Sequence, residues 1–173
     1  MTTTQVAVLQ MTSTSDVGAN LDQAEALVAK AASFGARLAV LPEGFAYMAP
    51  DGDQLKVAES LPDGGPILAR CRALAQRHQL ELVLGGFWER APDGQRIHNA
   101  CIHLTADGSV RSVYRKIHLF DVQLSDGTTL RESAGVAPGE RTVVTDTAFG
   151  KLGLSICYDL RFPELYRQLV DQG

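Results

Sequence analysis

The chain has 173 residues, of which 45% are hydrophobic and 21% are charged, and this is the composition of an ordinary globular protein. Its length fits one domain, so we expect residues 1–173 to belong to a single domain. With 16 basic and 20 acidic residues the formal net charge is −4, and the basic residues are spread along the chain. This charge pattern argues against a nucleic-acid-binding protein.

Neither a secretion signal nor a membrane anchor is indicated. The N-terminus lacks a basic segment followed by a long apolar run, and no apolar stretch approaches the length that spans a bilayer. The cysteines, Cys71, Cys101 and Cys157, are odd in number and widely spaced, which argues against both a disulfide framework and a zinc ribbon. We therefore expect a cytoplasmic protein whose cysteines are thiols.

The first elements in chain order predict a strand, a helix and a second strand. Residues 6–11 have the length and β-branched content of a buried strand. In the helix that follows, Asn20 is the predicted N-cap and Gly35 the left-handed residue after the C-terminus. A second buried strand, residues 37–41, ends at Pro42. This order favours a right-handed crossover between parallel strands.

A helix and three further strands are predicted next. Pro66 suits the first position of a helix that runs to about residue 78, and residues 80–88 return as a strand. Residues 97–105 and 110–116 are extended segments, and the Asp-Gly between them is a strong hairpin signal. The periodicity thus changes from alternating helix and strand to antiparallel strands.

The last part of the chain combines a long loop with a second hairpin. Residues 117–141 carry Gly, Pro, Ser and Asp without clear periodicity, and loops this long in a compact domain are usually functional. We expect this loop to border the active site. Residues 142–145 and 152–157 are predicted strands turned at residues 149–151, and Pro163 opens a final helix.

Cys157 is a candidate nucleophile because it lies at the predicted C-terminal end of a strand, just before a helix. Ligands bind at that end of the strands in open α/β sheets, and a helix N-terminus lowers a thiol pKa. A buried structural thiol is the alternative, and it describes most cysteines. Cys71, on the apolar face of a helix, and Cys101, inside a strand, are interpreted as structural.

Glu43 and Lys116 are weaker candidates when each is considered alone. Desolvation of Glu43 at a strand end would raise its pKa toward that of a general base, and Lys116 could hold an oxyanion. A solvated glutamate and a surface lysine are the alternatives. The histidines lack metal-binding spacing, so we expect no metal site, although His118 leaves a cysteine–histidine pair open.

Together these residues resemble the nitrilase superfamily, also called the carbon–nitrogen hydrolases, in which glutamate, lysine and cysteine occur in this order. The similarity runs through the whole chain, and some segments are similar to the Nit branch of the superfamily. The segments that carry it are Leu-Pro-Glu at 41–43, Leu-Gly-Gly-Phe-Trp-Glu-Arg at 84–90, Tyr-Arg-Lys-Ile-His-Leu at 114–119, Glu-Ser at 132–133 ahead of Pro-Gly at 138–139, and Ile-Cys-Tyr-Asp-Leu-Arg-Phe-Pro-Glu-Leu at 156–165.

The resemblance implies an α/β fold, a four-layer α-β-β-α sandwich commonly paired into homodimers or larger homo-oligomers. It also implies that the chain, a single carbon–nitrogen hydrolase domain over residues 1–173, lacks its C-terminal part after the strand and helix that carry the nucleophile. Such a sheet would have one face without its full covering, and we expect the isolated chain to aggregate and to be a poor catalyst.

The implied chemistry needs neither a metal nor an organic cofactor. Cys157 attacks an amide carbon and forms a thioester, Glu43 acts as general base, and the oxyanion is held by Lys116 and the backbone N–H of Tyr158. Glu132 matches a second family glutamate that orients the lysine and the substrate. Arg161 could bind a substrate carboxylate.

The predicted substrate is a small carboxylate-bearing amide. Nitrilases usually carry Cys-Trp-Glu, whereas this chain has Cys-Tyr-Asp at 157–159 like the Nit amidases, and it resembles most the enzymes that hydrolyse deaminated glutathione. An ω-amidase or N-carbamoyl amino acid hydrolase is the alternative enzyme, and a non-catalytic oligomerisation scaffold is the alternative class. For Arg161, an ion pair with Asp159 or Glu164 is the competing interpretation.

Overall fold

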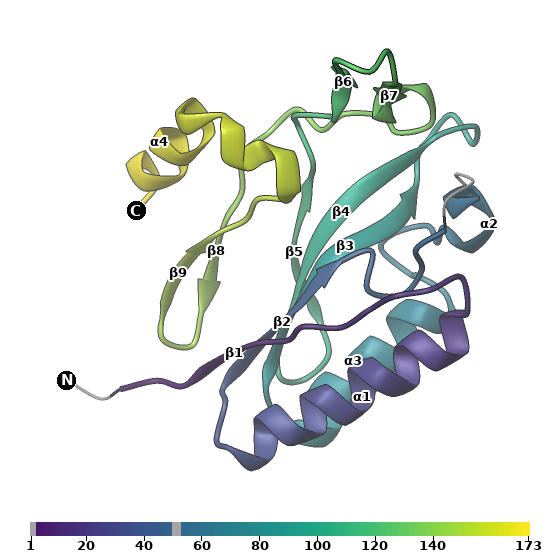
Figure 1. The fold of residues 1–173 in the computed structure, drawn as a ribbon. Coiled ribbons are helices and arrows are strands. Elements are labelled where there is room, and N and C mark those ends of the chain that lie inside the picture. The colour runs from purple at the N-terminus through teal and green to yellow at the C-terminus, as the bar shows by residue number, and fades with distance from the viewer. Residues whose placement is uncertain (1–2, 50–52) are drawn as a thin grey trace.

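A computed structural model describes residues 3–49 and 53–173 and shows a mixed α/β fold built on a central sheet (Figure 1). In this part of the chain the main sheet is five-stranded, in the order β1-β2-β3-β4-β5. The strands β1, β2 and β3 are parallel, and β3, β4 and β5 form an antiparallel meander. Their bounds are β1 Val6–Val8, β2 Leu38–Glu43, β3 Glu81–Arg90, β4 Ile97–Leu104 and β5 Val110–Arg115.

Two helices, α1 (Val17–Ser33) and α3 (Pro66–His78), lie side by side on one face of the sheet (Figure 1). A short helix, α2 (Gln54–Val57), lies near one end of this layer. The helices bury apolar residues that recur at three- and four-residue spacing, and these pack with inward-facing residues of the strands to form the larger core. The most deeply buried members are Ala24, Val28, Ala39, Leu41, Phe45, Leu68, Cys71, Ala75, Leu82, Leu84, Ala100, Ile102 and Leu104.

The opposite face of the sheet carries a second core under a hairpin, β8 (Val144–Thr147) and β9 (Gly150–Gly153), and the terminal helix α4 (Pro163–Asp171). The two elements lie on the other side of the sheet from α1 and α3 (Figure 1). The buried members of this core are Leu38, Val83, Cys101, Tyr114, Leu154, Ile156, Leu165 and Leu169. The sheet is therefore packed on both faces.

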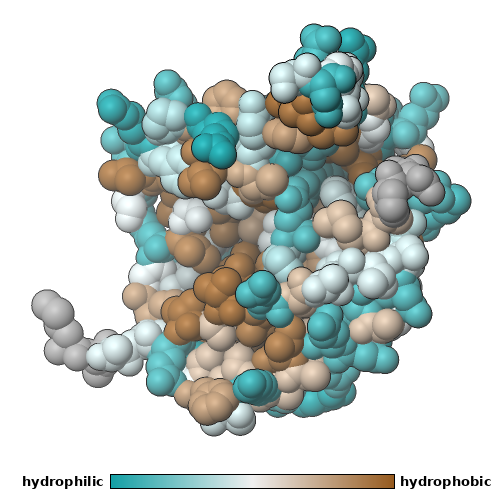
Figure 2. All heavy atoms as spheres, viewed as in Figure 1, coloured by the Kyte–Doolittle hydropathy of each residue, from teal (hydrophilic) through white to brown (hydrophobic). Residues whose placement is uncertain are grey.

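The covering of this second face is incomplete along β1. Val6 pairs with Leu38 and Val8 with Val40, so both β1 side chains share the face of the second core, yet Val8 is 83% exposed. Figure 2 shows apolar residues gathered on the surface where β1 and β2 lie. Val6 is 52% exposed as well, so apolar side chains of β1 face solvent on this side of the sheet.

Several local predictions are confirmed. Pro66 and Pro163 each occupy the first turn of a helix, and β1 and β2 are parallel around α1. Gly35 has φ +83°, the left-handed conformation expected after the helix end. The Asp-Gly turn joins β4 to β5 in an antiparallel hairpin.

The predicted N-cap of α1 was wrong. Asp16 caps the helix, because its Oδ1 accepts the N–H of Ala19 at 3.0 Å. Asn20 lies one turn into the helix, where its buried amide donates to the carbonyls of Thr14 and Ala46. Both residues suit an N-cap, and the contacts of Asn20 with the incoming chain decided which position each one takes.

Two predictions for the last third need correction. Residues 117–141 are not irregular throughout, since they contain a small hairpin, β6 (Asp121–Gln123) and β7 (Thr129–Arg131), followed by a 3-10 helix, η1 (Glu132–Ala134). The strand predicted over 152–157 ends at Gly153, and Cys157 begins a second 3-10 helix, η2 (Cys157–Arg161). Over residues 3–49 and 53–173, every helix falls short of the length and hydropathy needed to cross a membrane.

Candidate active site

Glu43 is the last residue of β2, and its carboxylate points to the end of the sheet where β4 and β5 also contribute. Its Oε1 accepts a hydrogen bond from Asn99 Nδ2 at 2.6 Å and lies 3.4 Å from Lys116 Nζ. The neighbouring β3 position is Gly86, where a Cβ would stand 2.7 Å from the Glu43 Cα. A side chain at position 86 would therefore displace the glutamate.

Lys116 follows β5 directly, and only 2% of its side chain is exposed. Its Nζ donates to Glu132 Oε2 at 2.9 Å and Oε1 at 3.1 Å, in addition to its contact with Glu43. Burial alone would lower the pKa of Lys116, but the Glu132 hydrogen bond and the charges of Glu43, Glu132 and Cys157 raise that pKa overall. The site therefore contains a buried ammonium between two carboxylates.

Glu132 reaches this cluster from the segment that follows the β6–β7 hairpin. It is the first residue of η1, and its Oε2 also accepts the backbone N–H of Phe120 at 2.6 Å. The carboxylate is thus held by a backbone donor and by Lys116. The long segment 117–141 does border the candidate site, as predicted.

Cys157 begins η2 with φ +49°, and it is close enough to Glu43, Lys116 and Glu132 for their charges to act on it. This left-handed conformation is rare outside glycine and is a local strain. Burial and the nearby charge of Glu43 raise the pKa of the Cys157 thiol, and the ammonium of Lys116 opposes them. A lowered thiol pKa was expected, and this expectation was wrong. Any lowering of the pKa by the short 3-10 helix is smaller than the rise caused by burial and by the charge of Glu43. At neutral pH the group is a thiol that needs a base.

The other two cysteines are buried structural thiols, as predicted. Cys71 packs in the helix-side core and Cys101 in the second core. Burial raises the pKa of each to about 12. Cys157 is the exposed cysteine of the chain.

Tyr158 and Arg161 lie on η2 beyond the thiol. The Tyr158 ring is half-buried and packs edge-to-face on Phe120 and Phe162, with ring centroids 4.9 Å and 5.5 Å apart. Arg161 is exposed, and within residues 3–49 and 53–173 it forms no ion pair with Asp159 or Glu164. The competing interpretation of Arg161 as an ion-pair partner is therefore not supported.

Three further residues of the site were missed or left open. Asn99 is fully buried and donates to Glu43, while its Oδ1 has no partner among the described residues. Asp159 is fully buried and accepts from Tyr114 and from His118. His118 Nδ1 therefore faces Asp159 at 2.7 Å rather than pairing with the thiol. A polar residue inside an apolar strand was the available signal for Asn99.

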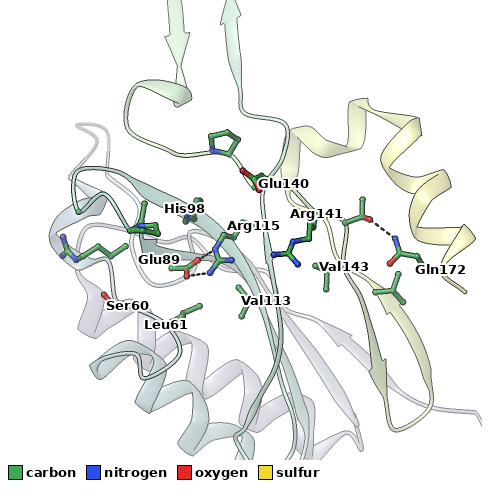
Figure 3. A pocket seen from close by; sticks show the side chains of 18 residues that line it. Ser60, Leu61, Glu89, His98, Val113, Arg115, Glu140, Arg141, Val143 and Gln172 are labelled. Atoms are coloured by element: carbon green, nitrogen blue, oxygen red, sulfur yellow. Dashed lines mark hydrogen bonds and ion pairs between the residues drawn. The ribbon is translucent and has the colours of Figure 1, made fainter.

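A large cavity lies elsewhere, lined by residues of β3, β5 and the segment that leads into β8 (Figure 3). It encloses about 1030 Å³ and is crossed by an ion pair in which Arg115 Nε donates to Glu89 Oε2 at 2.6 Å. Glu43, Lys116 and Cys157 do not line it. The convergence of charged groups, and not cavity size, identifies the candidate active site.

The chain is similar to known proteins over nearly its whole length. Residues 5–173 match the carbon–nitrogen hydrolase family. The chain is 40% identical over 170 residues to the deaminated glutathione amidase of Synechocystis, covering 96% of this chain and 62% of that protein. It is 42% identical over 173 residues to the human deaminated glutathione amidase, covering 97% of this chain and 52% of that protein.

A solved structure supports the same relationship. The C. elegans NitFhit protein superimposes with a TM-score of 0.88 at 34% identity, covering 97% of this chain and 41% of that one. The chain thus spans between half and two thirds of the length of these curated relatives. The fold prediction of a nitrilase-type α/β architecture is confirmed by this superposition. The chain belongs to the carbon–nitrogen hydrolase family, the nitrilase superfamily.

Proposed function

We propose that the protein hydrolyses the carbon–nitrogen bond of a small carboxylate-bearing amide through a thioester on Cys157. The observation that carries this proposal is the convergence of Glu43, Lys116 and Glu132 beside an exposed thiol. Lys116 Nζ lies 2.9 Å from Glu132 and 3.4 Å from Glu43, and the charges of all three act on Cys157. Few structural roles require a buried ammonium, two carboxylates and a strained cysteine in one place.

In the proposed reaction Glu43 removes the thiol proton as Cys157 Sγ forms a bond to the amide carbon. The oxyanion is held by the Lys116 ammonium and the backbone N–H of Tyr158. When the tetrahedral intermediate collapses, the carbon–nitrogen bond breaks and ammonia leaves with the proton that Glu43 returns. Water activated by Glu43 then adds to the thioester, the carbon–sulfur bond breaks, and the thiol is regenerated.

Glu132 is proposed to orient the ammonium rather than to exchange protons. Its two oxygens accept from Lys116 at 2.9 and 3.1 Å, and the Phe120 N–H fixes Oε2. This leaves Glu43, which accepts from Asn99 and is in hydrogen-bond contact with the Cys157 thiol, as the base.

The proposed substrate is deaminated glutathione. The relatives that carry this name are 40% and 42% identical to the chain, and Arg161 offers an exposed guanidinium four residues beyond Cys157. A guanidinium binds a carboxylate through two parallel hydrogen bonds. An ω-amidase or an N-carbamoyl amino acid hydrolase would use the same groups and remains the alternative.

The experiment is ammonia release from deaminated glutathione by the full-length protein and its single cysteine variants. Cys157→Ala should abolish turnover, whereas Cys71→Ala and Cys101→Ala should largely retain it because both thiols are buried away from the charged cluster. Turnover by Cys157→Ala at the original rate would refute the proposal. Absence of turnover of any small amide by the unsubstituted protein would favour the non-catalytic scaffold.

Arg161→Lys tests the substrate class. The variant keeps the charge but loses planar recognition, so turnover of a carboxylate-bearing amide should fall more than turnover of an uncharged amide. Equal losses on both amides would remove Arg161 from substrate binding. The resemblance also predicts a homodimeric or larger assembly, which sedimentation of the full-length protein measures. The cytoplasmic location, predicted from the N-terminus and the unpaired cysteines, is measured by cell fractionation.

A further inference from the structure

Asp159 is a fully buried carboxylate that accepts hydrogen bonds from two parts of the site. Its Oδ1 faces the backbone N–H of His118 at 3.1 Å and His118 Nδ1 at 2.7 Å. Its Oδ2 accepts from the Tyr114 hydroxyl at 2.7 Å and from the Ile156 N–H at 2.9 Å. A buried carboxylate is costly unless such donors surround it, so this arrangement is specific.

These donors flank the two groups that must meet in the proposed reaction. Ile156 directly precedes Cys157, and Tyr114 and His118 lie two residues before and two residues after Lys116. The Tyr114 hydroxyl also accepts the Ile117 N–H at 3.2 Å, which extends the network along the segment that carries the lysine. One carboxylate therefore joins the nucleophile turn to the end of β5.

The nucleophile turn needs such an anchor because Cys157 has φ +49°. A strained conformation of a residue other than glycine persists only where its surroundings hold it. The Asp159 carboxylate binds the N–H of Ile156, and the Asp159 N–H donates to the Ile156 carbonyl at 3.1 Å. This reciprocal pair closes the turn around the cysteine.

We propose that Asp159 is a positioning residue that holds the Cys157 thiol at a fixed position relative to the Lys116 ammonium. The roles of the thiol and the ammonium rest on the proposed function. The position of the thiol relative to the ammonium can, however, be tested without measuring turnover. The hydrogen bonds of its carboxylate go to Tyr114, His118 and Ile156, and not to the Cys157 thiol or the Lys116 ammonium. It acts through the backbone of residue 156 and through residues 114 and 118.

Asp159→Asn isolates this role because it keeps the side-chain volume. Each carboxylate oxygen accepts one backbone N–H, from His118 or from Ile156. An amide has one acceptor oxygen, so in either orientation its NH₂ group opposes a backbone N–H. The substitution should therefore displace the nucleophile turn while leaving the surrounding packing in place. Asp171→Asn, on the exposed end of α4, is the matched control.

The primary readout is the rate of Cys157 alkylation by iodoacetamide as a function of pH, followed by mass spectrometry of each cysteine peptide in the full-length protein. In the unsubstituted protein, burial, Glu43 and Glu132 raise the pKa of Cys157 and Lys116 lowers it. Displacement of the turn should weaken these effects on the thiol. The pH at the midpoint of the alkylation profile should then fall toward the pKa of an ordinary thiol. With deaminated glutathione, kcat should fall by about 100-fold while KM changes less.

The buried thiols of Cys71 and Cys101 report folding in the same experiment, because they become labelled only if the protein opens. If Asp159→Asn exposes the buried thiols, Tyr114→Phe is the second variant. It retains the ring and the Asp159 carboxylate but removes the hydroxyl that donates to Asp159 and accepts from Ile117, and it should lower kcat roughly fivefold. Folded variants with the original alkylation profile and kcat would overturn the proposal. If the unsubstituted protein turns over no amide, the proposed function fails, yet the alkylation profiles still decide whether Asp159 positions Cys157.

Discussion

Replacement of Lys116 by methionine would test the charged cluster most directly. The ammonium contacts two carboxylates at 2.9, 3.1 and 3.4 Å, and 2% of the side chain is exposed. Lys116→Met keeps the unbranched chain up to the ε position but removes the ammonium, which leaves Glu43 and Glu132 near each other without a cation. Removing one partner of a buried ion pair destabilises a protein by about 3–5 kcal/mol. Because solvent barely reaches this lysine, we expect a loss in that range.

The effect on catalysis should be separable from the effect on stability. Removal of one oxyanion donor lowers kcat by about 10²–10³-fold. In the double variant Lys116→Met with Glu132→Gln, one uncompensated charge disappears, so the free energy of unfolding should partly recover while kcat stays low. Urea unfolding and ammonia release measure the two quantities, with Lys30→Met on the exposed face of α1 as the control.

The sign of the pH dependence follows from the raised pKa of Lys116. The stabilisation by this lysine is complete below the ordinary lysine pKa of about 10.4 and is lost as pH rises through the higher folded value. The difference in unfolding free energy between the unsubstituted protein and Lys116→Met should therefore narrow only in strong alkali. Recovery of kcat in the double variant, or a single variant with unchanged kcat and stability, would refute the role assigned to Lys116.

Two further substitutions separate orientation from stability. Asn99→Leu removes the 2.6 Å hydrogen bond to Glu43, and it also removes a buried amide oxygen that has no partner among the described residues. We therefore expect kcat to fall about tenfold with little change in the urea midpoint of unfolding. A changed midpoint with constant kcat would contradict this. Glu59 accepts the N–H groups of Gly65, Ile67 and Leu68 at the start of α3. Glu59→Gln should cost roughly 1–3 kcal/mol in urea unfolding with kcat unchanged in the folded enzyme, and an unaltered unfolding midpoint would argue against the cap.

The elements that local chemistry decides could be predicted from the sequence. Pro66 and Pro163 open helices because each lacks an N–H that the first turn would leave without a partner, and Gly35 takes the left-handed conformation it favours. Glu43, Lys116 and Glu132 were predicted as one site from their motifs, and the structure brings their charged groups together.

The features that depend on tertiary contacts could not be predicted. Asn20 and Asp16 both suit an N-cap, and only the buried contacts of Asn20 with Thr14 and Ala46 decide between them. The 3-10 turn at Cys157 replaces the expected strand end because the distant Tyr114 and His118 hold Asp159 in place. No local sequence pattern predicts hydrogen bonds between residues this far apart in the chain.

The placement of Glu132 has a consequence for how the protein responds to heat or denaturant. The β6–β7 hairpin that precedes Glu132 is mostly exposed, so few apolar contacts hold it to the rest of the fold. Segments of this kind open locally at a small fraction of the global unfolding free energy, as amide hydrogen exchange reports. Opening would withdraw Glu132 from Lys116 while both cores stay closed. The arrangement of the candidate site and the global stability of the fold are thus distinct properties, and the first can be lost while the second persists.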